Sequence, residues 1–128
     1  MNNLLIDTNI LIWLAFNDTL SPKNLGLLSS ATNVYISVIS ILEIRIKQEL
    51  GKLDAFNILE AIQAMDISII PLDGAGAINY QLYGGQNTDP FDNALVSIAI
   101  NNKLILMTAD KKILLLKVPG LECINAKV

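Results

Sequence analysis

The strongest constraint on the fold of this chain is the alternation of short apolar runs with longer segments of helical periodicity. Five runs rich in β-branched and large aliphatic residues predict strands at residues 4–6, 34–37, 67–72, 104–107 and 121–124. Strands that alternate with helices are joined by crossovers, which make neighbouring strands parallel. The order therefore predicts an α/β fold of three layers, in which helices flank a central, mostly parallel sheet of four to five strands.

Capping residues and helix breakers predict where the helices lie. Thr8 or Asn9 is expected to cap the first helix, Ser21-Pro22 to open the second, and Asp54 to cap the fourth. The third helix is expected over 39–50 before Gly51, the fifth over 74–83, and the sixth from Asp89-Pro90. A loose loop over 84–88 separates the last two. No repeat or long linker interrupts this order, so residues 1–128 are expected to form one domain.

The apolar content bears on location and on self-association. Hydrophobic residues make up 52% of the chain, which favours a surface that a partner covers, and we expect the chain to self-associate. The longest apolar runs, residues 10–16 and 113–116, are far shorter than the ~18 residues of a membrane span. No basic residue precedes the first apolar run, and Asp7 soon interrupts it, so no signal peptide is readable. These features predict a cytoplasmic protein without a membrane segment.

The residue types that are missing exclude several kinds of chemistry. The chain has no histidine and a single cysteine, Cys123, which is expected to be a core residue of the last strand. Catalysis by Ser-His-Asp or Cys-His groups is therefore excluded. Zinc sites built from His and Cys are excluded too, so a bound metal would be a hard cation with oxygen ligands, first of all Mg²⁺ or Mn²⁺.

Five acidic residues occupy positions that a parallel sheet brings together. Asp7 directly follows the first predicted strand, and Asp110 follows the fourth after two residues. Asp89 and Asp92 lie at the start of the helix that leads into the fourth strand, and Glu43 lies in the helix after the second. Because ligands of such sheets bind beyond the carboxyl ends of the strands, these five carboxylates can converge. Their mutual repulsion would cost several kcal/mol, which argues for a bound divalent cation.

Each acid also has an ordinary structural interpretation. Glu43 could pair with Lys47 one helical turn away, a contact worth about 0.2–0.5 kcal/mol. Asp89 before a proline has the position of an N-cap, and Asp92 that of an acid that stabilises the helix dipole. Asp7 and Asp110 could cap the segments that follow them. Caps alone, however, do not explain carboxylates after two separate strand ends.

Four stretches of the chain together resemble the PIN domains of the VapC toxin group. They are the opening strand that ends in Asp7-Thr8-Asn9, the stretch Ser40-Ile41-Leu42-Glu43, the signature Asp89-Pro90-Phe91-Asp92, and the strand that ends in Thr108-Ala109-Asp110. Three positions depart from the pattern. Asn87 and Asn93 stand where the family often has histidine and arginine, and Lys103 stands where it usually has glycine.

The resemblance implies a metal-dependent endoribonuclease that hydrolyses RNA phosphodiester bonds and leaves 5′-phosphate and 3′-hydroxyl ends. Asp7, Glu43, Asp92 and Asp110 would hold one or two Mg²⁺ or Mn²⁺ ions, and Asp89 would be an additional or water-mediated ligand. The residues that would support these ligands through hydrogen bonds are Thr8, Asn9 and Thr108.

The resemblance also implies partners. A VapC-like toxin forms a homodimer and binds a small VapB-like antitoxin, for which the apolar residues 10–16 and 39–46 are suitable surfaces. RNA is the substrate, although the formal net charge is −3. Five of the twelve acidic residues belong to the candidate site, and the nine basic residues outnumber the rest. Lys111 and Lys112 are the best candidates for contacts with phosphate.

Other functions are also compatible with the sequence. A catalytically weak PIN fold that acts as an RNA-binding or scaffold module would predict loss of one or more ligands, and all five acids are present. A phosphatase with an Asp-x-Asp motif would need an acid at the position of Asn9. A DNA-directed relative of the 5′ nucleases would need a helical clamp, for which the chain has no room.

Overall fold

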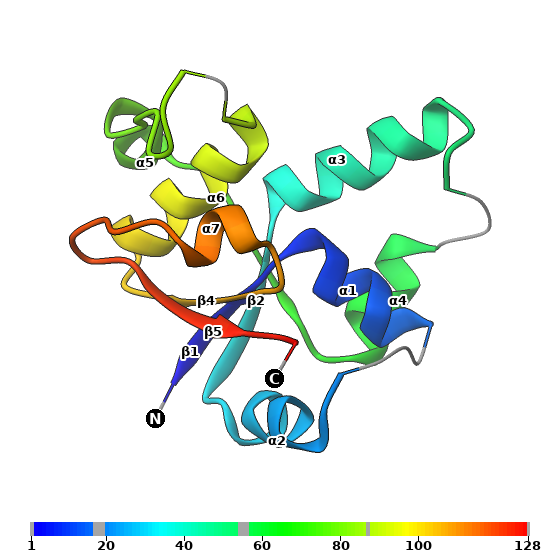
Figure 1. Cartoon of the computed structure of the whole chain (residues 1–128). Helices are drawn as coiled ribbons and strands as arrows, with labels where there is room; N and C mark the ends of the chain where they lie inside the picture. The colour runs from blue at the N-terminus through cyan, green and yellow to red at the C-terminus, as the bar shows by residue number, and fades with distance from the viewer. Residues whose placement is uncertain (1, 17–19, 54–56, 87, 128) are drawn as a thin grey trace.

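A five-stranded parallel sheet forms the centre of the molecule (Figure 1). The computed structural model describes residues 2–16, 20–53, 57–86 and 88–127. The strands are β1 (Asn3–Ile6), β2 (Asn33–Ser37), β3 (Ser68–Ile70), β4 (Ile105–Thr108) and β5 (Glu122–Asn125), in the order β3-β2-β1-β4-β5. Every neighbouring pair is parallel, which confirms the predicted α/β class.

Helices cover both faces of the sheet, as expected for three layers. Those in the described part of the chain are α1 (Thr8–Ala15), α2 (Pro22–Ser30), α3 (Val38–Glu49), α4 (Ile58–Ala64), α5 (Gly74–Ile78), α6 (Pro90–Asn101) and α7 (Lys111–Leu114). Leu4 and Ile6 face a core that includes Ile44 of α3, whereas Leu5 faces a second core that includes Ile98 of α6. The alternation follows from the two-residue period of a strand.

β1 owes its central place to side chains that are buried on both faces. Leu4, Leu5 and Ile6 have no exposed surface. Burying a side chain of this size contributes about 1.5–3 kcal/mol relative to leaving it in water. Cys123 of β5 is half-buried against the second core, and burial raises the pKa of its thiol, as expected of an unreactive packing residue.

The start of α1 differs from the prediction. The helix begins at Thr8 and its N-cap is Asp7, so the expected cap at Thr8 or Asn9 is wrong. The side chain of Asp7 makes no capping hydrogen bond, and its Oδ2 accepts a hydrogen bond from the hydroxyl of Thr108. The hydroxyl of Thr8 is likewise directed elsewhere, to Glu43.

Other helices differ in length or in their caps. The predicted helix over 74–83 ends at Ile78 in α5, and the short helix α7, capped by Asp110, was not predicted. The expected cap Asp54 lies outside the described residues, and α4 is capped by Asn57, whose side chain accepts a hydrogen bond from the backbone N–H of Glu60. Ser21 caps α2 through the N–H of Asn24, as predicted.

The chain enters β4 through a residue in the left-handed region. Lys103 has φ of +54°, where glycine is favoured because a Cβ atom meets the backbone. Lys103→Gly is therefore expected to raise the free energy of unfolding by about 0.5–1 kcal/mol, measured by urea denaturation. Lys117→Gly removes the same charge at an exposed residue outside this region and should not stabilise the protein. Equal effects of both substitutions would contradict the backbone explanation.

The length and composition of the helices bear on membrane insertion. Within the described ranges, none is long and apolar enough to cross a bilayer.

Candidate metal and active site

The candidate site lies where the two central strands end side by side. The N–H of Asp7, after β1, donates to the carbonyl of Met107 in β4 at 3.0 Å. The chain places β2 and β3 on one side of β1, and β4 and β5 on the other, so the strand order reverses between β1 and β4. Such a reversal opens a crevice beyond the strand ends. Asp7 and Asp110 both follow strands that end at this crevice.

Two threonine hydroxyls hold acidic side chains at the crevice. Thr108 is fully buried, and its Oγ1 donates to Oδ2 of Asp7 at 2.7 Å and accepts from the N–H of Asp110 at 3.0 Å. Thr8, 4% exposed, donates from Oγ1 to Oε1 of Glu43 at 2.6 Å. Hydrogen bonds to an ionised group are short and strong, so these contacts fix the two carboxylates in place.

The remaining acids differ in whether their carboxylates accept hydrogen bonds. Oδ1 of Asp89 accepts from the N–H of Phe91 at 2.8 Å, and Oδ1 of Asp110 accepts from the N–H of Lys112 at 2.8 Å. Both therefore act as helix N-caps with one carboxylate oxygen. Asp92 is half-buried in the first turn of α6, and its carboxylate makes no hydrogen bond to any described residue.

The pKa of Asp92 reflects the negative charge of the other four acids. Its pKa is raised to about 7, first by burial and then by the negative charges of Asp89, Asp110, Asp7 and Glu43. The pKa of Asp7 is raised too, mainly by burial, against the effect of its hydrogen bonds to Thr108 and to the backbone of Thr8. Among the described residues, no positively charged group lowers the pKa of Asp92. Negative charge from four segments of the chain, at Asp7, Glu43, Asp89–Asp92 and Asp110, therefore acts at Asp92.

The five acidic side chains are of a ligand type that suits a hard divalent cation. All five groups are carboxylates, the ligands that Mg²⁺ and Mn²⁺ prefer. Within the described ranges, however, no three acidic or thiol side chains lie close enough to coordinate a single ion. The site therefore has the charge and the ligand type for a metal but is not closed around a metal position.

The raised pKa values predict how the stability of the metal-free protein depends on pH. Because the folded-state pKa values of Asp7 and Asp92 lie above their unfolded values, these groups favour the folded state at low pH. That contribution is lost as pH rises through the folded-state pKa, which is about 7 for Asp92. In EDTA, the melting temperature should therefore fall between about pH 5.5 and about pH 8. Circular dichroism measures the melting temperature. A melting temperature that rises over this pH interval would contradict the proposed repulsion.

Four other residues from the sequence analysis are Asn9, Lys111, Lys112 and Asn87. Asn9 is exposed, and its side chain makes no hydrogen bond within the described part of the chain. Lys111 and Lys112 are exposed at the start of α7. Only Lys112 lines the pocket described next. Asn87 lies outside the described residues.

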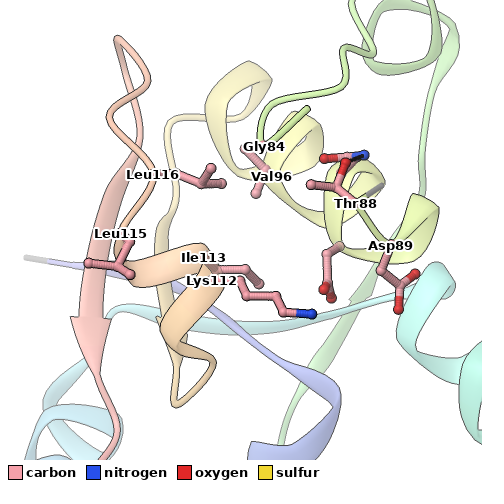
Figure 2. A pocket seen from close by; sticks show the side chains of 10 residues that line it. Gly84, Thr88, Asp89, Val96, Lys112, Ile113, Leu115 and Leu116 are labelled. Carbon is pink, nitrogen blue, oxygen red and sulfur yellow. Dashed lines mark hydrogen bonds between the residues drawn. The ribbon is translucent and has the colours of Figure 1, made fainter. Parts of the chain in front are cut away.

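A pocket opens beside the acids, between α6, α7 and the loop before α6 (Figure 2). Its volume is about 370 Å³, and its lining residues are Gly84, Thr88, Asp89, Asp92, Asn93, Val96, Lys112, Ile113, Leu115 and Leu116. Sequence reasoning identified Asn93 only as a departure from a family pattern. Its Nδ2 donates to Oγ1 of Thr88, a contact that depends on a loop whose path no periodicity predicts.

Comparisons with known proteins place the fold. A model of the PIN domain family matches residues 4–120. A chain of the VapBC2 complex from Rickettsia felis, bound to a DNA fragment from the promoter, has a TM-score of 0.68 at 19% identity, over 96% of this chain and 98% of that chain. A chain of the DNA-bound VapBC complex from Salmonella typhimurium has a TM-score of 0.69 at 16% identity, over 98% of both chains.

A third solved structure agrees with these two. A chain of the toxin-antitoxin complex VapBC-5 from Mycobacterium tuberculosis has a TM-score of 0.66 at 18% identity, over 98% of this chain and 99% of that chain. No curated protein sequence matches the chain significantly. At such low identity the solved structures show a shared fold, whereas the family model matches the sequence across nearly its whole length. The chain therefore belongs to the PIN domain family.

Proposed function

We propose that the protein is a metal-dependent endoribonuclease and the toxin of a toxin-antitoxin pair. The observation that carries this proposal is the state of Asp92, whose pKa is raised to about 7 by burial and by four other carboxylates. A fold gains nothing in stability from gathering uncompensated negative charge, so such a cluster is expected at a functional site. Membership of the PIN family and the likeness to chains of VapBC complexes support the same interpretation.

The acids would divide the work of binding Mg²⁺ or Mn²⁺. Asp7 and Glu43, oriented by Thr108 and Thr8, would be fixed ligands. Because the carboxylate of Asp92 makes no hydrogen bond to a described residue, it can turn toward an ion without breaking one. Asp110 keeps Oδ2 for an ion while Oδ1 caps α7.

A bound divalent ion would offset negative charge on the phosphate oxygens and lower the pKa of a water molecule, so that hydroxide would be available to attack phosphorus. Asp89 uses one oxygen as a cap and would contribute a further or water-mediated contact. Lys111 and Lys112, which follow Asp110, would bind RNA phosphate. We assign Asn9 a supporting role that requires its side chain to turn toward the ligands.

An antitoxin would cover apolar surface next to these acids. Four side chains spaced one turn apart form an exposed stripe on α3 and its C-cap, at Val38, Leu42, Ile46 and Leu50, of which Leu50 is 63% exposed. An unpaired stripe with this spacing fits an amphipathic helix. We propose a small VapB-like antitoxin there, a homodimer as the toxin's assembly, and a cytoplasmic location, which toxin action on RNA requires.

One observation favours the alternative of a catalytically weak RNA-binding or scaffold module. No three acidic side chains among the described residues are already assembled around an ion position. If the set does not close when metal is present, the fold could still bind RNA through Lys111 and Lys112. Metal-dependent turnover distinguishes these two functions.

The test is cleavage of a mixed-sequence RNA by the purified native protein with Mg²⁺, with Mn²⁺ and with EDTA. Fragments with 5′-phosphate ends should form with either ion and not with EDTA, and Asp7→Asn should cut at least about a hundredfold more slowly. RNA binding without cleavage under all three conditions would support the scaffold alternative. Equal cleavage by the native protein and Asp7→Asn would contradict the ligand assignment.

A further inference from the structure

The pocket beside the acids has apolar walls and a charged mouth. Val96, Ile113, Leu115 and Leu116 supply the apolar lining, and we take the charged lining residues, Asp89, Asp92 and Lys112, as the mouth. Figure 2 shows Lys112 extending across the pocket in the direction of Asp89. No ion pair joins Lys112 to a carboxylate within the described ranges, so its ammonium group is available to a bound anion.

A buried amide adds a hydrogen-bond acceptor to this pocket. Asn93 is only 2% exposed, and its Nδ2 donates to Oγ1 of Thr88 at 2.8 Å and, more weakly, to the hydroxyl of Tyr80 at 3.4 Å. The Thr88 hydroxyl itself donates to the carbonyl of Gly85 at 2.8 Å, so its oxygen must accept from Asn93. This network fixes which end of the amide carries the N–H groups.

The amide oxygen of Asn93 is left without a partner by the same network. Oδ1 accepts no hydrogen bond from any described residue. Among the described residues, no fully buried side-chain nitrogen or oxygen lacks a partner, so Oδ1 must retain some accessible surface. Asn93 lines the pocket, and we infer that this surface of Oδ1 faces it.

We propose that this pocket holds the base of an RNA nucleotide next to the phosphate that is cleaved. The proposal rests on the proposed ribonuclease function and adds a substrate subsite to it. The aliphatic walls would cover the faces of the base, and Oδ1 of Asn93 would accept an N–H from its edge. A volume of about 370 Å³ is near the lower end for ligand pockets, which suits one base.

The position of the pocket favours a base over an apolar side chain of a peptide. Asp89 and Asp92 belong both to the carboxylate cluster and to the mouth, so a phosphate held at the cluster lies at the entrance. Its own nucleotide must then occupy the nearest surface. A free ammonium group at the mouth and an acceptor inside match a phosphate and a base edge, whereas an apolar side chain would use neither.

The test measures single-turnover cleavage with Mg²⁺ for RNA oligonucleotides that carry a cut site found in a random-sequence RNA pool. Each nucleotide that flanks the cut is replaced in turn by an abasic residue. One of these replacements should slow cleavage roughly tenfold, and an abasic residue farther away should not. In Leu115→Ala, an exposed wall residue whose loss leaves the core intact, the tenfold ratio should fall to roughly threefold.

Ile78→Ala is the matched control, since Ile78 is about as exposed as Leu115 and does not line the pocket. It should keep the full difference between intact and abasic RNA. Cleavage that is indifferent to both abasic replacements, or a ratio that Leu115→Ala leaves unchanged, would overturn the base pocket and leave an apolar peptide as its occupant. Absence of metal-dependent cleavage of any RNA would instead overturn the ribonuclease function, and the subsite with it.

Discussion

Asp92→Asn is expected to slow metal-dependent RNA cleavage at least about a hundredfold and, in the absence of metal, to raise the melting temperature at about pH 8 by a few degrees. Both effects have one cause. The carboxylate of Asp92 is held half-buried near four others, which raises its pKa to about 7. The substitution removes a proposed metal ligand and, with it, the charge that repels the other acids.

Opposite changes in activity and stability distinguish this explanation from general damage to the fold. Glu122→Gln is the control, because it removes an exposed negative charge at the start of β5, away from the strand ends that form the crevice. It should change neither the cleavage rate nor the melting temperature appreciably. If Asp92→Asn melted at a lower temperature than the native protein without metal, the repulsion inferred at this residue would be wrong.

Thr108→Val is expected to lower the free energy of unfolding by about 1–3 kcal/mol and the cleavage rate by about 10- to 100-fold. Valine has nearly the shape of threonine but lacks the hydroxyl that donates to Asp7 and accepts from the N–H of Asp110. The substitution leaves a buried carboxylate, 7% exposed, without this donor. It also removes the acceptor of the Asp110 N–H, and with it the hydrogen bond that positions Asp110 next to β4.

Thr108→Ser keeps the hydroxyl and should retain most of the activity, which makes it the matched control for this position. Urea denaturation and the rate of RNA cleavage, measured on both variants, test the two parts of the prediction. If valine and serine gave equal cleavage rates, the hydroxyl of Thr108 would have no role in orienting Asp7 and Asp110.

The sheet could be predicted because each strand is a short run with a strong apolar pattern. Leu4, Leu5 and Ile6 are fully buried on two faces, which only an inner strand of a covered sheet requires. Helix ends were predicted where one local signal dominates, as at Ser21 and at Gly51, whose φ is +73°. The short helix α7 carries too few residues for a periodicity to be visible.

The candidate site could be predicted only in outline. The parallel order of the strands places Asp7 and Asp110 at one edge of the sheet, and this follows from the sequence. The sequence does not say which oxygens are used as caps, as in Asp89, because that choice depends on local backbone geometry. Nor could it show the acceptor at Asn93, since its orientation depends on Thr88 and Gly85 in a loop without regular structure.

The central claim is that acids from distant segments bind a common divalent ion, and diffraction from crystals of the native protein soaked in Mn²⁺ tests it most directly. Anomalous density for manganese is predicted between Asp7, Glu43, Asp92 and Asp110, with carboxylate oxygens at about 2.2 Å from the ion. Crystals that hold manganese at other sites and none at these four residues would contradict the claim.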